Sequence, residues 1–267
     1  MIAIHRHTQP LIFADGLEIG PVVGGGAGNG LLNALIAYWP GNEANGNALD
    51  LHTNGLPLTD ANTVTSNPGL VYAAARQYTA ANLEYHARPG DDALLSTGNV
   101  DFTIATWCRA DSYPAYPEIV SKWQGTGNNF EYRLIRYPIL GVDRFRFYVS
   151  RDGGTTNQVP ADSLGIPAIN TWYLIVAWHD SVADTINIQI NNGAVDSLAF
   201  NTGVADKAAP FTIGSRSEPT ASAYWDGRIG PTMFWKSAAG LGGVLDATKR
   251  SALYNAGAGL PYAAFTL

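Results

Sequence analysis

Basic residues are scarce in this sequence, and they are not gathered into runs. Of the 267 residues, 16 are Lys or Arg and 22 are Asp or Glu, which gives a formal net charge of -6. Proteins that bind nucleic acids or anionic membrane surfaces carry clustered positive charge. The composition therefore argues against both kinds of partner.

Cysteine and long apolar runs are equally lacking. Cys108 is the only cysteine, which excludes an intramolecular disulfide and a cysteine metal cluster, and its apolar surroundings FTIATWC favour a buried packing role. No uninterrupted apolar run reaches membrane-spanning length. The N-terminus, MIAIHRHTQPLIFADG, mixes polar residues where a signal peptide needs a continuous apolar stretch. We therefore expect no membrane insertion and no signal peptide.

What the chain does contain is a series of short β patterns from Leu35 onward. Runs such as FTIATWC, RFRFYVS, WYLIVAWH and TINIQINN are separated by turn clusters such as GTGNN, RDGGTTN and NNG. TINIQINN places three isoleucines on one face and polar residues on the other, which predicts a half-exposed strand. WYLIVAWH is apolar on both faces, as expected of a central strand. The pair predicts a hairpin, and the whole pattern predicts an all-β, two-sheet antiparallel sandwich.

Two segments depart from this pattern. Residues 1–33 combine a short strand-forming piece with the glycine-rich VVGGGAGNG, which predicts an N-terminal arm on a flexible hinge, followed by a sandwich over residues 34–267. A terminus without a role is the alternative. Near the other end, VLDATKRSALYNAGAG has an approximate 3.6-residue apolar stripe and predicts one short helix with Gly257 as its C-cap.

The order of segments resembles the laminin-G-like branch of the concanavalin A-like lectin/glucanase superfamily. ALIAYWPGNEANGNALDLHTNGLPLT resembles the first strand and acidic turn of that family, DFTIATWCRAD its Phe-Thr-Ile strand with a Trp, and NTWYLIVAWHDSVADTINIQINNGAVDS its long hairpin. PFTIGSRS with YWDGRIGPTMFW resembles the closing strands, and LDATKRSALYNAGAGLPY the C-terminal helix. The resemblance covers about residues 34–262 and implies a jelly roll of two curved sheets.

Glycoside hydrolases of this superfamily carry paired carboxylates at alternate positions of one strand, because two carboxyl groups must flank the scissile bond. The chain has six glutamates, and none has a second acid two residues away on a predicted strand. Glu131 is followed on the same predicted face by Arg133 and Ile135, so we expect it to be an unpaired acid beside a base. Nucleophile, zinc-protease and phosphate-loop motifs are also missing. The sequence predicts a protein that is not an enzyme.

Two kinds of binding site remain as candidates. The resemblance implies a structural calcium ion, for which Asp50, Asn54 and Asp226 match the early and late turns, although Gly230 and Pro231 replace the acidic pair that often follows. Turn capping by the aspartates is the alternative. A glycan needs exposed rings with polar neighbours, and candidates near turns or on one strand face are Trp123, Tyr113, Tyr116, Arg146, Tyr148 and Trp225. Core or subunit packing is the alternative for each ring.

Two functions are consistent with these features. The first is a structural or decorating protein on a virion surface, most simply that of a phage, with residues 1–30 joining neighbouring subunits by strand addition. The second is a carbohydrate-binding lectin or adhesin module at a bacterial cell surface, with a cell-surface glycan as its partner. The absent acid pair and the arm favour the first, and a glycoside hydrolase is a distant third.

Overall fold

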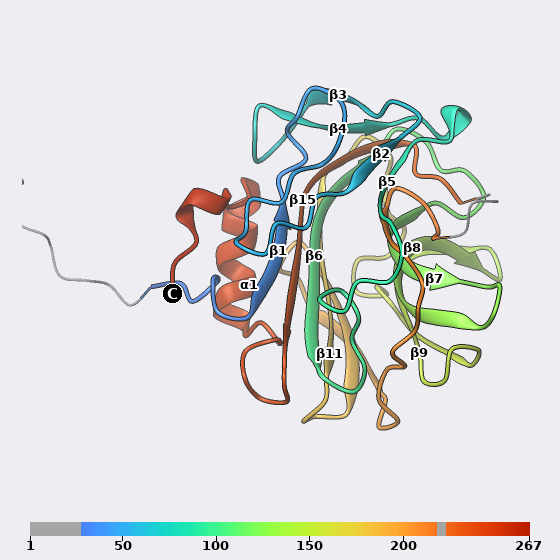
Figure 1. The fold of residues 1–267 in the computed structure, drawn as a ribbon, viewed down its shortest axis with the longest axis vertical. Helices are drawn as coiled ribbons and strands as arrows, with labels where there is room; N and C mark the ends of the chain where they lie inside the picture. Colours follow the sequence, from blue (N-terminus) through green and yellow to red (C-terminus); the bar gives the residue numbers. More distant parts are fainter. Residues whose placement is uncertain (1–27, 218–222) are drawn as a thin grey trace, which may run out of the picture.

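In the computed structural model, residues 28–217 and 223–267 are described, and they form two facing antiparallel sheets (Figure 1). The first sheet has eight strands in the order β13-β12-β11-β6-β15-β4-β3, with β1 also paired to β15. These strands are β1 Leu35–Trp39, β3 Thr65–Pro68, β4 Ala74–Tyr78, β6 Asp101–Ala110, β11 Tyr173–Asp180, β12 Thr185–Ile190, β13 Val195–Ala199 and β15 Gly227–Ser237.

The second sheet has seven strands in the order β10-β9-β8-β7-β14-β5-β2. They are β2 Thr59–Ala61, β5 Tyr85–Arg88, β7 Glu118–Gln124, β8 Asn129–Ile139, β9 Val142–Ser150, β10 Thr156–Pro160 and β14 Phe211–Ile213. Short 3-10 helices lie at Ala80–Asn82, Asn255–Gly257 and Tyr262–Ala264. The predicted all-β sandwich is confirmed.

The predicted hairpin is confirmed as β11 and β12, which pair in register from Ile175 with Ile190 to Asp180 with Thr185. The isoleucines of β12 face the main core, as expected. The polar face of β12 was expected to be exposed, but Asn187 and Gln189 are only 5% and 6% exposed. The side chain of Arg250 reaches Gln189 Oε1 at 2.7 Å, so the C-terminal helix covers this side of the strand.

Two apolar cores lie on opposite sides of the eight-stranded sheet. The larger fills the space between the sheets and includes Cys108, which is fully buried as predicted. The smaller lies between the eight-stranded sheet and the C-terminal segment, where the helix α1 Ala247–Tyr254 contributes Leu253 (Figure 1). The predicted helix is confirmed but is shorter than its apolar pattern. Its N-cap is Asp246, which accepts from Lys249 N, and Asn255, not Gly257, is the left-handed C-cap.

A β-bulge in β8 decides which way one acidic side chain points. Lys122 pairs with Tyr132 and Trp123 pairs with Phe130, so Glu131 is the extra residue between the two pairs. The simple alternation that would place Glu131 on the face of Arg133 is therefore interrupted. Glu131 does lie beside a base, as expected, but that base is Lys122, at 2.7 Å from its carboxylate, and not Arg133.

The predicted arm falls mostly on residues 1–27, which lie outside the described residues, so its role stays a prediction. The residues that follow it are packed: Trp235 Nε1 donates to Leu31 O at 2.8 Å, and Asn29 Nδ2 donates to Ala264 O at 2.7 Å. Leu31 is fully buried. The packed part of the chain therefore begins before residue 34.

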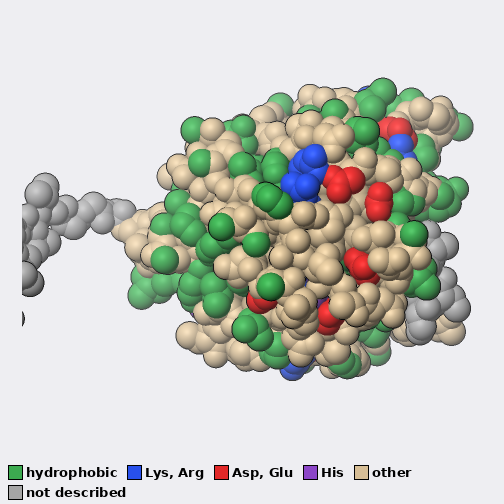
Figure 2. Space-filling model, turned by 90° about the horizontal axis from the view of Figure 1, so that it is seen from above, with side chains coloured by type: hydrophobic (Ala, Val, Ile, Leu, Met, Phe, Trp, Pro, Cys, Tyr) green, Lys and Arg blue, Asp and Glu red, His purple; other side chains and the backbone are tan. Residues whose placement is uncertain are grey.

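The surface seen in Figure 2 carries few charged side chains. They form small groups among hydrophobic and uncharged polar atoms, rather than one extended patch of a single sign. None of the helices in residues 28–217 and 223–267 is long and apolar enough to cross a membrane.

Candidate ligand-binding face

The seven-stranded sheet has a second face, which points away from the main core and which we call the outer face. Because strand side chains alternate, Leu134 and Phe147 point into the main core while their neighbours point outward. A separate apolar cluster forms on the outer face of β7, β8 and β9, and it consists of Trp123, Ile135 and Tyr148 with Phe130 and Tyr137 at its margin.

Arg133 occupies the middle of this cluster. Its guanidinium carbon lies 4.5 Å from the ring centroid of Trp123 and 4.5 Å from that of Tyr148. Phe130 stacks on Trp123 with 4.3 Å between the centroids and 10° between the planes. The guanidinium of Arg133 and the ring of Phe130 are both too close to Trp123 to share one face of its indole. They therefore lie on opposite faces, and both faces of Trp123 are occupied. Desolvated cation–π contacts of this kind contribute about 2 kcal/mol, which rigidifies the outer face.

The structure brings four of the six predicted ligand residues to this region. Trp123, Arg146 and Tyr148 share the outer face, and Tyr116 joins them through Tyr137, whose centroid lies 5.0 Å from that of Tyr116 and 6.5 Å from that of Tyr148. Only Tyr116 is well exposed, at 45%, whereas Trp123, Arg146 and Tyr148 are buried. Trp123 therefore does not present the exposed ring that the sequence-based hypothesis required.

The other two predicted ligand residues lie elsewhere. Trp225 is fully buried and belongs to the main core. Tyr113 packs against that core with its ring centroid 6.4 Å from that of Trp225, and the guanidinium of Arg136 covers it at 4.6 Å. For these two residues the structure agrees with the alternative of core packing, and a loop position in the sequence did not make either ring a surface platform.

Polar groups on the same outer face are buried without full pairing. Glu118 is fully buried, and its Oε1 accepts from Arg133 at 2.9 Å and from Arg216 at 3.3 Å. In the described part of the chain, Glu118 Oε2, Ser121 Oγ and Arg133 Nε are buried and have no hydrogen-bond partner. Unsatisfied buried polar atoms are costly, so further polar contacts to these three atoms would be favourable.

A pocket of about 290 Å³ opens beside these groups, where β2, β5 and β14 form one side of the seven-stranded sheet. It is lined by one ring, one acid, one base, three hydroxyls and small apolar groups, contributed by Tyr85, Asp60, Arg216, Thr59, Thr212, Ser217, Ala61, Ala87, Pro89 and Pro210. Since Arg216 also contacts Glu118, the pocket is continuous with the polar groups of the outer face.

Three of the pocket residues are held in place by hydrogen bonds to the segments that adjoin β2 and β14. Asp60 Oδ1 accepts from Val64 N at 2.9 Å, Thr212 Oγ1 donates to Ser215 O at 2.7 Å, and Ser217 Oγ donates to Pro210 O at 2.7 Å. None of these residues was among the candidates from sequence. Asp60 and Arg216 lie far apart in the chain and meet only because β5 pairs with both β2 and β14, a long-range arrangement that no local motif signals.

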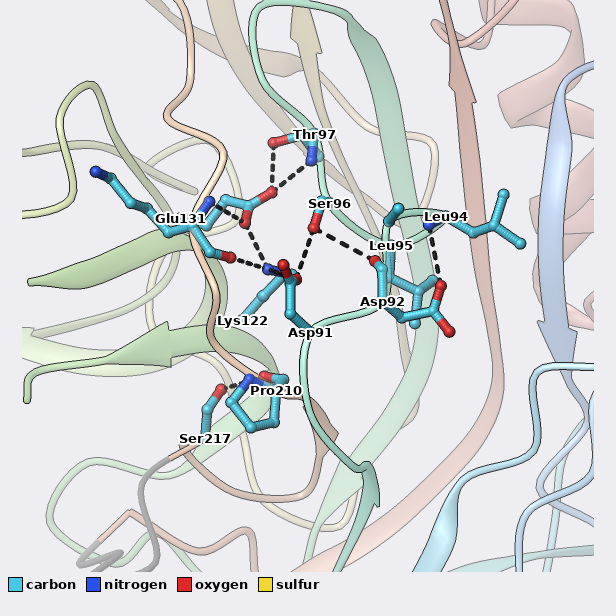
Figure 3. Close-up of polar contacts among 12 residues, drawn as sticks. Asp91, Asp92, Leu94, Leu95, Ser96, Thr97, Lys122, Glu131, Pro210 and Ser217 are labelled. Atoms are coloured by element: carbon cyan, nitrogen blue, oxygen red, sulfur yellow. Dashed lines mark hydrogen bonds and ion pairs between the residues drawn. The ribbon is translucent and has the colours of Figure 1, made fainter. Parts of the chain in front are cut away.

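A buried ion network lies near the pocket, under the loop that follows β5 (Figure 3). Lys122 and Glu131 are both fully buried, and Lys122 Nζ contacts Glu131 Oε2 at 2.7 Å and Asp91 Oδ1 at 2.9 Å. Burial raises the pKa of Glu131, against the opposing effect of the Lys122 charge and of hydrogen bonds from Thr97. The network fastens the loops around Asp91 and Lys207 to β7 and β8.

The residues expected to hold calcium do not fit a shared ion. Asp50 Oδ1 accepts from Tyr38 N and His52 N, both at 2.9 Å, and its Oδ2 accepts from Leu56 N at 3.0 Å. Asn54 Nδ2 donates to Ile36 O at 2.7 Å. These contacts are turn capping, the alternative that the sequence left open.

Asp226 lies too far from the other two. Its Oδ1 accepts from Ala80 N at 3.2 Å and its Oδ2 from Ser112 Oγ at 2.6 Å. Asp50 contacts Tyr38, which pairs with Met233 on β15. Asp226 directly precedes Gly227 at the start of the same strand, and the six residues from Gly227 to Met233 span about 20 Å. In residues 28–217 and 223–267, no group of three or more His, Cys, Asp or Glu side chains is arranged to hold a metal ion.

The chain matches one protein-family model, that of the concanavalin A-like lectin/glucanases superfamily (Laminin_G_3), over residues 85–240. This range covers more than half of the 267 residues. No curated protein sequence matches the chain.

Solved structures share the fold at low sequence identity. Domain 4 of the GH43 extracellular arabinanase AbnA from Geobacillus stearothermophilus, solved with arabinotriose, has a TM-score of 0.55 and 13% identity, with 81% of this chain and 98% of that chain covered. The binding domain of botulinum neurotoxin DC, solved with rat synaptotagmin II, has a TM-score of 0.57 and 14% identity, with 84% of this chain and 52% of that chain covered.

A structure of botulinum neurotoxin type C, a toxin whose cell entry depends on interaction with two ganglioside molecules, has a TM-score of 0.54 and 12% identity, with 84% of this chain and 51% of that chain covered. The chain thus spans about half the length of the toxin domains. At such identities these similarities establish the fold alone.

Proposed function

Because the chain belongs to the concanavalin A-like lectin/glucanase superfamily, we propose that it is a non-enzymatic domain that binds a glycan in the pocket beside β2, β5 and β14. The proposal places the protein on an outer surface, that of a bacterial cell or of a virion, where glycans are met. The observation that carries it is the pocket itself, with its mixture of one ring, one acid, one base and several hydroxyls.

This mixture suits a saccharide. A sugar ring has an apolar face that packs on an aromatic ring and a rim of hydroxyls that need both donors and acceptors. Tyr85 offers the ring, and Thr59, Ser217 and Arg216 offer polar groups at the rim. Asp60 lies between Thr59 and Ala61 on β2 and pairs with the buried His86, so its carboxylate points to the other face of the strand. A volume of about 290 Å³ is at the small end for ligand sites, so the expected occupant is one or two sugar units at the end or branch of a glycan.

The neighbours in fold support a binding role. The arabinanase domain was solved with a bound arabinotriose, and a botulinum neurotoxin binding domain was solved with a sialylated ligand, SialylT. These ligands belong to those proteins. The arabinanase domain is matched over 98% of its length, so it illustrates that this sandwich can present a saccharide site, whereas the match to the toxin covers 51% of that chain.

The described glutamates support a non-enzymatic role. Glu118 and Glu131 are fully buried against basic side chains, Glu84 accepts from Thr79 N and Asn82, and Glu43 pairs with Arg76. A hydrolase would need two carboxyl groups facing one open groove, whereas these four are engaged in separate structural contacts. Glu18 and Glu218 lie outside the described residues.

Replacing Tyr85 by Ala is expected to weaken glycan binding about tenfold, because the lost ring contact is worth about 1.4 kcal/mol. Thr59→Val, which keeps the shape but removes the hydroxyl on the pocket face of β2, should weaken it by a smaller factor. The measurement is a glycan array to identify a ligand, followed by calorimetric titration of the variants. Tyr116→Ala is the matched control: this ring is 45% exposed but lies outside the pocket, so binding should be unchanged. A blank array would contradict the proposal, and so would equal losses in all three variants.

The alternative of a virion subunit depends on the N-terminal arm and has a separate test. Since Asn29 and Leu31 contact the C-terminal segment and β15, the informative deletion is of residues 1–27, which leaves these contacts intact. If the arm joins subunits, the shortened protein should keep its melting temperature but no longer co-sediment with the assembly that retains the full-length chain. Unchanged co-sedimentation would count against a role of the arm in assembly.

A further inference from the structure

The amine of Lys122 lies between two carboxyl groups in a part of the protein that excludes water from the amine. Nζ is 2.9 Å from Asp91 Oδ1 and 2.7 Å from Glu131 Oε2 (Figure 3). The side chains of Lys122 and Glu131 are 0% exposed, and that of Asp91 is 41% exposed. Formation of an amide bond between side chains needs three groups: an amine, a carboxyl group in contact with it, and a second carboxyl group that can carry the proton. Lys122, Asp91 and Glu131 supply these groups.

The surrounding contacts fix the orientation of each group. Nζ also donates to Lys207 O, so its hydrogens point to three acceptors: Asp91, Glu131 and this carbonyl. Ser96 Oγ donates to Asp91 Oδ1 at 2.9 Å, and that oxygen is the one that faces the amine. When a proton moves from Nζ to Glu131, the carbonyl of Lys207 still holds one hydrogen, and the free electron pair can turn toward the carboxyl carbon of Asp91.

We propose that Lys122 and Asp91 become joined by an intramolecular isopeptide bond, with Glu131 as the group that carries the proton. Nζ attacks the carboxyl carbon of Asp91, and the hydroxyl of Ser96 stabilises the oxygen that takes on charge. Two protons leave the ammonium group, pass through Glu131, and depart with one oxygen of Asp91 as a water molecule. The C–O bond is exchanged for a C–N bond, the charges of the pair cancel, and no other reactant is needed.

Burial makes this step favourable in two ways. The ammonium group of Lys122 is fully buried and expensive to keep away from water, and an amide removes its charge. Burial also raises the pKa of Glu131, so that this carboxyl group can hold a proton during the exchange. The resting form is the ion pair, because burial raises the pKa of Asp91 but hydrogen bonds from Lys122 and Ser96 outweigh that effect and lower it.

The fold supplies the proximity that the reaction needs. Groups held in reactive geometry behave as if present at effective concentrations of about 10⁵–10⁸ M, which favours amide formation over hydrolysis. The bond would connect the loop that contains Asp91 to β7 and would enclose the polypeptide between them. Such a cross-link restricts the unfolded chain and raises resistance to heat and proteolysis, properties suited to a protein on an outer surface.

The decisive measurement is the intact mass of the purified, folded full-length protein. We expect a mass one water molecule below that of the sequence, and a tryptic digest that contains the peptide of Asp91 covalently attached to the peptide of Lys122. A protein at its full sequence mass overturns the proposal. A loss of one water with the two peptides separate also overturns it, because the loss then reflects cyclisation elsewhere, such as a succinimide.

Variants separate a chemical role from a structural one. Asp91→Asn should form the same bond with loss of ammonia instead of water, and Asp91→Ala should keep its full mass. Glu131→Gln should also keep its full mass while remaining folded by circular dichroism; retention of the cross-link in this variant would overturn the role of Glu131. Asp162→Asn, which removes a distant carboxylate paired with Arg144, is the control that should still lose one water.

Discussion

Replacing Glu131 by Leu is expected to lower the free energy of unfolding by about 3–5 kcal/mol, the cost of breaking a buried ion pair from one side. The variant also lacks the group proposed to carry the proton, so no bond to Asp91 forms, and the buried amine of Lys122 keeps Asp91 as its single carboxylate partner. It also leaves Thr97 N, Thr97 Oγ1 and Lys207 N without their acceptor. The measurement is chemical denaturation followed by tryptophan fluorescence.

Two further variants make this result interpretable. Asp162→Asn removes an ion pair to Arg144 from an aspartate whose side chain is 63% exposed, and it should cost less than about 1 kcal/mol. The double variant Lys122→Met/Glu131→Leu replaces both buried charges by apolar groups and should recover part of the loss. If Glu131→Leu costs no more than Asp162→Asn, the network does not stabilise the loops that it connects.

Acidification from pH 6.5 to pH 4 is expected to remove about 3 kcal/mol of stability through His86 alone. Burial, assisted by the charge of Arg76, lowers the pKa of His86 from 6.5 to about 4. His86 is fully buried, its Nδ1 lies 2.9 Å from Tyr78 Oη, and its Nε2 lies 3.1 Å from Gly46 O. The ring is therefore neutral, with Nε2 as donor and Nδ1 as acceptor.

The sign of the effect follows from which state binds the proton. Between pH 4 and 6.5 the unfolded chain protonates this histidine and the folded protein does not, so stability is complete above pH 6.5 and falls as the pH decreases toward 4. His179, whose pKa burial also lowers, adds to the same slope. The test is the free energy of unfolding of wild type and His86→Gln across this range. The variant can keep one donor and one acceptor, and its slope should be smaller; equal slopes would show that His86 does not carry the effect.

The candidate site was predictable only in part. Alternation in RFRFYVS correctly places Arg146 and Tyr148 on one face, since period-two alternation is a local property of any strand. It could not show that Trp123 would be covered by Phe130 and Arg133, because a ring is covered by whichever strand lies beside it. The bulge at Glu131 is a related case: one extra residue reverses the side on which a carboxylate lies, and no turn residue marks it.

The sequence by itself determined the class of the fold and the nature of its surface. Short alternating runs separated by turn residues specify a two-sheet sandwich, and the 16 Lys and Arg residues among 267 give a surface with little positive charge. The tertiary structure alone decided where ligand chemistry can gather: the pocket joins Asp60, Tyr85 and Arg216, and the ion network joins Asp91, Lys122 and Glu131. The physical reason is that alternation depends on neighbours in the chain, whereas these groups meet through long-range strand pairing, whose partners are selected by burial of the whole core.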